Sequence, residues 1–184
     1  MGNETPHAVA AGETLEEVLA FRAAALSREE LDEDTSDRMS LLLFRIGDEW
    51  YAVGVECVRE IFQEYELTAI PCVPEFILGV VNVRGEILSV TDPARIMGIG
   101  TIESPADAKS PAIVIAIEDV ATALVVDEIG DITDVPSGSV EPPVSIIDRS
   151  QAEFIEGSVY VNGSMVGILK VDRVLEPIGN SNKH

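Results

Sequence analysis

The segment Phe76–Asp92 shows the clearest pattern of hydrophobic and polar positions in the chain. Two apolar runs rich in β-branched residues, Ile77–Val83 and Ile87–Thr91, flank the polar residues Arg84-Gly85-Glu86. Short apolar runs around a glycine-containing interruption predict a β-hairpin. This hairpin is the element around which we expect the rest of the chain to be organised.

From Leu41 onward most of the chain follows the same pattern, with turn signals such as Gly47-Asp48-Glu49 and Asn162-Gly163 between apolar runs. The remaining strands are expected at Leu41–Ile46, Trp50–Val55, Cys57–Phe62, Ile113–Ile117, Ala121–Val126, Asp127–Val135, Phe154–Val161 and Met165–Val171. Gln63–Pro74 is expected to be a loop, Pro93–Gly100 one helical turn, and Thr101–Pro111 a linker.

The first forty residues have a different pattern. Apolar residues recur at helical spacing between Glu13 and Leu26, and Thr14 with Glu17 fits a capping box. A second short helix is expected from Ser27 to about Asp32, followed by a charged linker to Ser40. This extension is either a solvated or loosely docked helix, or an amphipathic helix that docks in a partner's groove.

The two halves of the chain resemble each other. Ala52–Ile61 parallels Ala123–Ile132 in its spacing of apolar and acidic residues, and Gly79–Gly85 parallels Gly157–Gly163. Repeated supersecondary units indicate repeated architecture. We therefore predict a mainly β fold of two small barrels side by side, divided near residues 100–112, within a domain at 41–178 that is preceded by the extension 1–40 and followed by a polar tail at 179–184.

The charge balance excludes several classes of partner. The formal net charge is -21, which argues against binding to nucleic acid or to anionic lipid. The first residues are polar rather than a signal peptide, and no apolar run approaches the roughly 20 residues of a membrane span. We expect a cytoplasmic protein without direct membrane insertion, whose acidity reflects either a salt-loving source or simply an acidic adaptor.

Catalytic chemistry is poorly represented. The only histidines, His7 and His184, lie in expected tails, and Cys57 and Cys72 are expected to be small buried residues. No phosphate-binding or dinucleotide fingerprint and no zinc-ligand cluster occurs, so no cofactor or metal is expected. A carboxylate-based site stays open by count alone, but an enzyme is not expected.

Arg84 is a lone cation at the hairpin turn of an acidic chain. It either holds the fold through an ion pair or faces a partner, and the two roles are compatible. Glu60, on the expected strand Cys57–Phe62 of the same half, is the best local partner. We predict a Glu60–Arg84 ion pair.

The same residues carry a family likeness. Phe44-x-x-Gly47-Asp48, Val58-Arg59-Glu60-Ile61, Ile70-Pro71-x-x-Pro74-x-Phe76 and Gly79-Val80-x-Asn82-x-Arg84-Gly85 resemble the CheW family of chemotaxis coupling proteins. In the second half, Val125-Val126-Asp127-x-Ile129 and Phe154-Ile155-x-Gly157 also match. The resemblance covers about Leu41–Glu176.

The resemblance implies a fold and partners. The family fold is two SH3-like, five-stranded β-barrels packed around a shared apolar core. Its members are non-catalytic adaptors that couple the cytoplasmic tip of a chemoreceptor to the regulatory domain of the chemotaxis histidine kinase. By this likeness Val58, Glu60, Arg84 and Ile87 would form the receptor-binding groove. Leu67 and Ile70 would meet the kinase, together with Gly79, where bulk would disturb the hairpin.

Two positions depart from the family pattern, and one alternative function stays open. The family usually shows proline where Ser89 stands and leucine where Pro93 stands, so the strand edge near Asp92 is expected to differ. The alternative is a CheW-like regulator of another chemosensory output, such as surface motility or second-messenger control. In that case the N-terminal helix, residues 13–32, would choose an extra partner.

Overall fold

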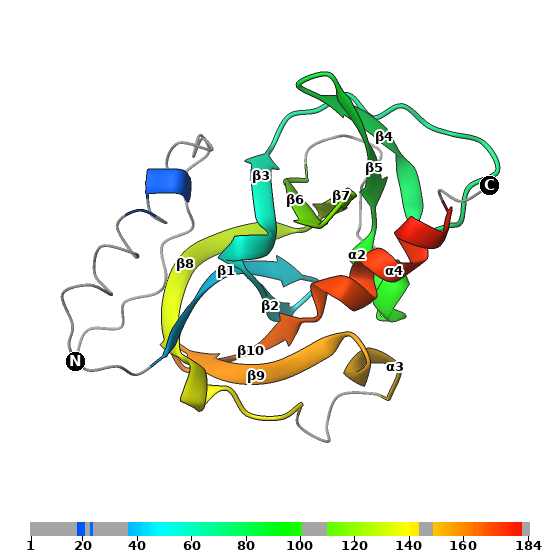
Figure 1. The fold of residues 1–184 in the computed structure, drawn as a ribbon. Coiled ribbons are helices and arrows are strands. Elements are labelled where there is room, and N and C mark those ends of the chain that lie inside the picture. The colour runs from blue at the N-terminus through cyan, green and yellow to red at the C-terminus, as the bar shows by residue number, and fades with distance from the viewer. Residues whose placement is uncertain (1–17, 21–22, 24–36, 101–109, 144–148, 182–184) are drawn as a thin grey trace.

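The computed structural model describes residues 18–20, 23, 37–100, 110–143 and 149–181, which form two five-stranded sheets (Figure 1). The strands are β1 (Arg38–Ile46), β2 (Glu49–Gly54), β3 (Val58–Phe62), β4 (Ile77–Val83), β5 (Glu86–Thr91), β6 (Ala112–Ile117), β7 (Val120–Val125), β8 (Glu128–Pro136), β9 (Ile155–Val161) and β10 (Ser164–Leu169). The helices are α2 (Pro93–Met97), α3 (Arg149–Ala152) and α4 (Val171–Ser181), with single 3-10 turns η1 (Val55–Cys57) and η3 (Ser137–Ser139).

The two sheets have the same strand order once the halves of the chain are aligned. Barrel A has the order β8-β1-β2-β10-β9, and barrel B has the order β3-β6-β7-β5-β4. Replacing β1 to β5 by β6 to β10, and the reverse, converts one order into the other. Each sheet also pairs one strand in parallel with a strand of the other half, β2 with β10 and β5 with β7. The mainly β fold of two five-stranded barrels is confirmed.

The boundary predicted near residues 100–112 does not divide the barrels, because each barrel draws strands from both halves. The chain crosses from barrel A to barrel B at η1, and it crosses back between β7 and β8. The repeat in the sequence therefore records two equivalent units, but it does not say which strands pair. The interleaving ties the barrels into one body, since neither sheet can form from one half alone.

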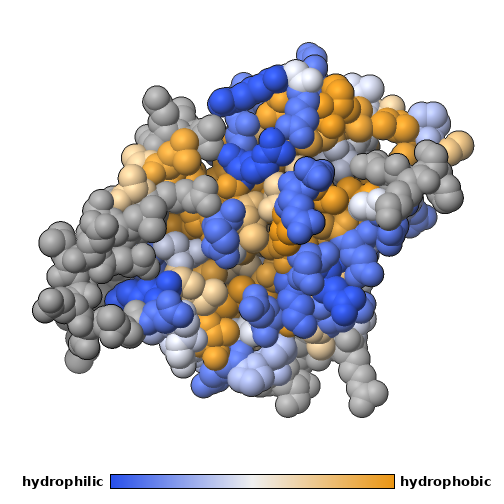
Figure 2. Space-filling model, in the orientation of Figure 1, coloured by the Kyte–Doolittle hydropathy of each residue, from blue (hydrophilic) through white to orange (hydrophobic). Residues whose placement is uncertain are grey.

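One apolar core serves both barrels. The larger buried cluster includes Phe44 and Val53 of barrel A together with Ile113 and Leu124 of barrel B, and a smaller cluster around Leu41 lies in barrel A alone. On the face in Figure 2, hydrophobic side chains come to the surface over the β4–β5 hairpin, between groups of hydrophilic ones. The shared core matches the apolar seam that two adjacent barrels require.

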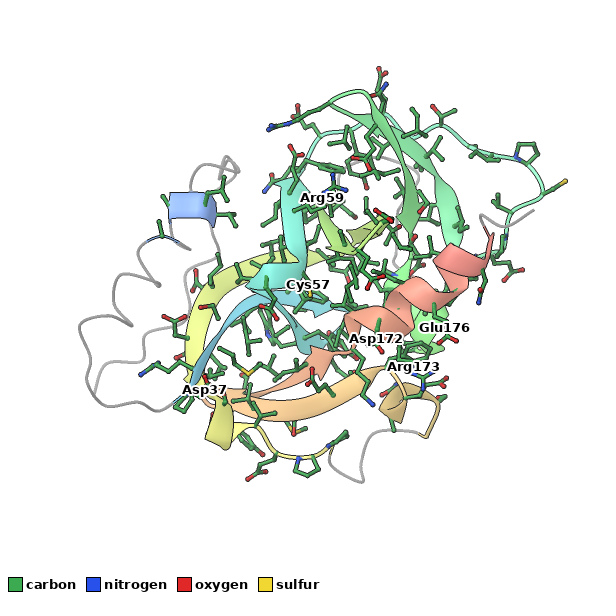
Figure 3. All side chains as sticks on the ribbon, in the orientation of Figure 1. Asp37, Cys57, Arg59, Asp172, Arg173 and Glu176 are labelled. Atoms are coloured by element: carbon green, nitrogen blue, oxygen red, sulfur yellow. The ribbon has the colours of Figure 1, made fainter. Side chains whose placement is uncertain are left out.

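The C-terminal helix is a correction to the predicted tail. The sequence predicts a polar tail from Gly179, but α4 continues to Ser181 and buries Val174, Leu175 and Ile178 in the shared core. These apolar residues recur at helical spacing, while Pro177 within the segment argues against a helix. Figure 3 shows Asp172, Arg173 and Glu176 along α4. Arg173 and Glu176 form an ion pair, with 3.0 Å between Arg173 Nη1 and Glu176 Oε2.

The N-terminal boundary also shifts. β1 begins at Arg38, which pairs with Pro136 of β8, so the last residues of the predicted linker are strand. Of the predicted N-terminal helix, Val18–Ala20 and Ala23 are described and helical, while the rest of 13–26, the expected helix from Ser27 and residues 33–36 lie outside the described residues. Val18 is buried in the shared core. At this position the extension contributes to this chain's own packing.

The cysteines differ from the prediction that both are buried. Cys57 is half-buried and packs against the shared core, whereas Cys72 is exposed. Cys72 occupies the turn after Pro71 with a φ of 60°, within the loop between β3 and β4, which carries it to the surface. In the part of the chain that the structure describes, no helix is long and apolar enough to cross a membrane.

Candidate functional site

The β4–β5 hairpin closes with a two-residue turn. Val83 pairs with Glu86, and the intervening Arg84 and Gly85 have φ values of 53° and 90°. Positive φ at both central positions is the geometry that best matches the twist of a hairpin. The Gly85 N–H donates to Asn82 Oδ1 at 2.8 Å, so the Asn82 side chain stabilises the turn. The predicted hairpin is confirmed, and its turn fixes the backbone from which Arg84 projects.

Two ion pairs join this hairpin to β3. Arg84 Nη2 lies 3.2 Å from Glu60 Oε1, and Arg59 binds both carboxylate oxygens of Glu86, with Nη2 to Oε2 at 2.9 Å. β3 is one end of the sheet order of barrel B and the β4–β5 hairpin forms the other end, so the pairs join β3 to the hairpin across the closure of the barrel. Arg59 is labelled in Figure 3, beside β3 and below the hairpin. A positive residue precedes a negative one both on β3 and at the hairpin turn. Opposite charges therefore face each other in only one alignment of the hairpin against β3.

The Glu60–Arg84 pair leaves most of Arg84 accessible. The Arg84 side chain is 69% exposed, whereas that of Glu60 is 21% exposed. Such a pair contributes about 0–1 kcal/mol to stability, since water screens it. The guanidinium therefore keeps donors for a partner while Glu60 restricts where it lies.

The other two residues assigned to the receptor groove differ from each other in exposure. Ile87, on the hairpin, is 61% exposed, so its side chain is accessible to a partner. Val58, at the start of β3, is buried in the shared core. Ile87 can touch a partner directly, while Val58 supports the position of β3.

Gly79 holds the loop that carries Leu67 and Ile70. Thr68 and Val80 exchange two backbone hydrogen bonds of 2.8 and 2.9 Å, which fasten this loop to β4. A Cβ on Gly79 would lie 2.4 Å from the Thr68 carbonyl oxygen, and Gly79 has a φ of 154°. Leu67 packs against the core and Ile70 is exposed. Only glycine permits this close approach, so Gly79 fixes the position of the loop against β4.

The two departures from the family pattern have local explanations. The Ser89 hydroxyl is hydrogen-bonded to Thr122 Oγ1 at 2.9 Å, and Thr122 also contacts Thr91 Oγ1 at 2.7 Å. Pro93 occupies the first turn of α2, where its missing N–H is not needed, and the buried Asp92 caps the helix by accepting from Ala94 N at 2.9 Å. Both residues are accommodated without disturbing the hairpin.

The sequence reasoning missed the Arg59–Glu86 pair. The signal was available, because Arg59-Glu60 on the strand and Arg84-Gly85-Glu86 on the hairpin carry opposite charges in matching order. Among the described residues, no group of three or more His, Cys, Asp or Glu side chains is arranged to hold a metal ion.

Two interleaved β-barrels, with charged and apolar side chains exposed at one hairpin, define a small β-barrel protein with a candidate surface for protein partners. The sequence profile of the CheW-like domain matches residues 40–178. The chain therefore belongs to the CheW-like domain family.

Individual relatives agree with this membership. The probable chemotaxis protein CheW of Rhizobium etli is 31% identical over 134 residues, covering 72% of this chain and 84% of the relative. Protein FrzA of Myxococcus xanthus is 29% identical over 135 residues, covering 72% and 82%. The crystal structure of the scaffolding protein TtCheW from Thermoanaerobacter tengcongensis superimposes with a TM-score of 0.64 at 29% identity, covering 73% of this chain and 90% of that one.

Proposed function

We propose that this chain is a non-catalytic adaptor that couples the cytoplasmic tip of a chemoreceptor to the regulatory domain of the chemotaxis histidine kinase. Membership of the CheW-like domain family supports this function, as does similarity to a protein titled as a scaffold. The observation that carries the proposal is the ion-paired hairpin, which presents an exposed cation at its turn and an exposed aliphatic residue on its second strand. The adaptor would work in the cytoplasm and reach membrane receptor arrays through its partners.

The receptor-binding groove would run along the end of barrel B where β3 meets the hairpin. Arg84 and Ile87 would touch the receptor tip, Glu60 would orient Arg84, and Val58 would support β3 from the core. An acidic or amide side chain on the receptor helix suits the accessible guanidinium, and an apolar residue suits Ile87. Because the chain has a net charge of -21, an exposed cation such as Arg84 would help to set the register of an acidic partner.

The kinase would bind at the loop between β3 and β4. Ile70 is exposed there, Leu67 packs behind it, and Gly79 fastens the loop to the sheet. The loop is separate in sequence from the hairpin turn. As an adaptor, the domain would hold one partner at each of these two segments.

A second candidate function is the regulation of another chemosensory output, with partner choice by the N-terminal segment. Two observations favour it. The match to protein FrzA brings in a relative whose name does not mention chemotaxis, and residues 1–39 precede the matched family domain.

Titrations against the two partners test the proposal. Wild-type protein should bind both the kinase regulatory domain and a receptor-tip peptide, Arg84→Glu should lose the receptor tip, and Ile70→Glu should lose the kinase. If neither partner binds to wild type, the coupling function is wrong. If both variants lose both partners while remaining folded, the two-surface assignment is wrong.

A further inference from the structure

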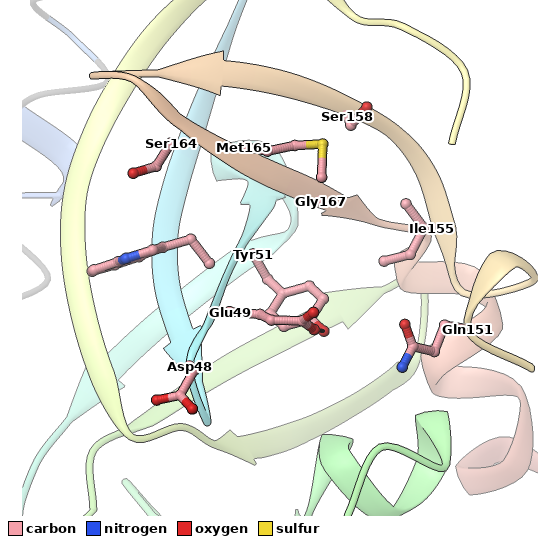
Figure 4. A pocket seen from close by; sticks show the side chains of 10 residues that line it. Asp48, Glu49, Tyr51, Gln151, Ile155, Ser158, Ser164, Met165 and Gly167 are labelled. Carbon is pink, nitrogen blue, oxygen red and sulfur yellow. Dashed lines mark hydrogen bonds between the residues drawn. The ribbon is translucent and has the colours of Figure 1, made fainter. Parts of the chain in front are cut away.

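Barrel A carries a pocket of about 320 Å³ that lies away from the ion-paired hairpin (Figure 4). It lies between the start of β2, the β9–β10 hairpin and α3. The lining residues are Asp48, Glu49, Trp50, Tyr51, Gln151, Ile155, Ser158, Ser164, Met165 and Gly167. Its volume is at the low end of the range of about 300–1,000 Å³ typical of ligand sites, which suits one long side chain.

Three polar side chains in this pocket are available for a ligand. Asp48 and Glu49 bring negative charge to the pocket, and neither forms an ion pair within the described part of the chain. Glu49 Oε2 accepts a hydrogen bond of 2.6 Å from the Tyr51 hydroxyl, which fixes its direction. Ser158 is only 3% exposed, and its hydroxyl has no hydrogen-bond partner among the described residues. The hydroxyl can therefore accept a hydrogen bond from a ligand in the pocket.

Apolar side chains extend the pocket outward. Met165 lines the pocket and is 39% exposed, and it pairs across the hairpin with Tyr160, which is 69% exposed. At Gly167 a Cβ would lie 3.4 Å from both Ile155 Cδ1 and Tyr51 Cδ1, so the missing side chain keeps the pocket open. The result is an acidic pocket continuous with an exposed apolar strip on one hairpin.

The pseudo-symmetry of the fold says what kind of element suits this face. In barrel B the equivalent strands β6 and β7 are covered by α4, whose Gly179 lies against Val120 at the start of β7. Glu49, at the start of β2, is the counterpart of Val120. The counterpart of α4 is α2, which ends at Met97 after little more than one turn. The place that α4 fills on barrel B is therefore left open on barrel A, where the pocket lies.

We propose that this face of barrel A binds a helical segment of a partner protein that inserts a lysine or arginine between Asp48 and Glu49 and lays apolar residues on Met165 and Tyr160. The carboxylates select a cation, and the Ser158 hydroxyl accepts a hydrogen bond from it. The apolar strip selects an amphipathic helix rather than a free amine. This surface is separate from the receptor and kinase surfaces proposed above and does not depend on them.

Trp50 makes the proposal directly measurable, because it lines the pocket and is the only tryptophan of the chain. The probe is a tryptophan-free amphipathic peptide of leucine and lysine, compared with a length-matched peptide of leucine and glutamate. The Leu/Lys peptide should change Trp50 fluorescence saturably, and the Leu/Glu peptide should not. Asp48→Asn with Glu49→Gln should weaken binding about tenfold, while keeping the shape of both side chains.

The matched control removes equal charge from the equivalent turn of barrel B, as Glu118→Gln with Asp119→Asn. It should change the affinity by less than about twofold, since that turn is not at the pocket. Met165→Gln should weaken binding without any change of charge. Equal weakening by both charge-removing variants would show general attraction to an acidic protein and would overturn the proposal. An unchanged affinity in Asp48→Asn/Glu49→Gln would also overturn it. Arg84→Glu should leave this binding intact, so failure here and failure of the coupling function are distinguishable.

Discussion

Arg84 reaches across the closure of barrel B to Glu60, with 3.2 Å between Nη2 and Oε1. Because the Arg84 side chain is largely exposed, Arg84→Glu should lower the free energy of unfolding by only about 0–1 kcal/mol. The same change should abolish binding of the receptor tip, since the partner-facing cation is replaced by an anion. Denaturant unfolding and a binding titration on the same preparation measure the two effects.

The charge-swapped variant Glu60→Arg/Arg84→Glu separates structure from recognition. It restores an ion pair and should recover the stability lost in Arg84→Glu, but it should not recover receptor binding. Recovered binding would mean that the pair serves only to hold the hairpin, and the partner-facing role of Arg84 would be wrong.

Gly79 should be the most sensitive glycine of the loop-bearing hairpin. Gly79→Ala places a Cβ against the Thr68 carbonyl and should lower the free energy of unfolding by about 1–3 kcal/mol. Gly138→Ala is the control, because nothing lies within 4 Å of its added Cβ. Gly79→Ala should also weaken kinase binding, since the loop that carries Ile70 loses its attachment to β4. Equal melting temperatures for the two variants would contradict this reading.

The elements of the fold and of the candidate site differ in how far the sequence predicts them. The β4–β5 hairpin could be predicted because its apolar runs and its turn are local signals. The Glu60–Arg84 contact could be proposed because cations are scarce in this chain. The assignment of strands to barrels could not be predicted, since β1 and β2 join β8–β10 in one sheet while β3–β5 join β6 and β7 in the other, and no local signal records which sheet a strand joins. The sequence analysis did not predict α4, whose apolar residues Val174 and Ile178 recur at helical spacing but are interrupted by Pro177.

Tyr65 offers a test of buried polar groups. Its hydroxyl is buried without a hydrogen-bond partner in the described part of the chain, and burial raises its pKa. Tyr65→Phe should therefore raise the free energy of unfolding by about 1 kcal/mol, because it removes an unsatisfied group while keeping the ring packed on Phe62. Destabilisation in urea titrations would show that the hydroxyl is satisfied in solution.

Tyr51→Phe should lower the free energy of unfolding, unlike Tyr65→Phe, and the size of this loss should depend on pH. Its hydroxyl donates to Glu49, and burial, followed by that carboxylate, raises its pKa. The folded state keeps the phenol neutral, so its contribution is complete below the unfolded pKa of about 10 and is lost as the pH rises above that value. Tyr51→Phe should cost about 1 kcal/mol at neutral pH and should show a shallower loss of stability above pH about 10. Parallel curves for wild type and variant across that range would contradict the assignment.

The position of β1 defines how the N-terminal extension should be tested. Deleting Met1–Ser36 keeps all of β1 and the Asp37 carbonyl that accepts from Ser137 N at 2.8 Å, whereas deleting Met1–Ser40 removes Arg38–Ser40 from the sheet. The shorter deletion should lose the packing of Val18 in the shared core, and the longer one should lower the melting temperature further. A coupling adaptor should keep its affinity for kinase and receptor after the shorter deletion. Loss of kinase binding at that point would favour a specialised regulator whose partner is chosen by the N-terminal helix.

The most direct test of the central claim is a titration of the full chain against the kinase regulatory domain in the presence and absence of the receptor tip. The account predicts saturable binding of each partner, a ternary complex, and selective loss of the receptor tip in Arg84→Glu. Absence of binding to both partners by a folded protein would contradict the coupling function and leave the two-barrel fold as the only part of the account still standing.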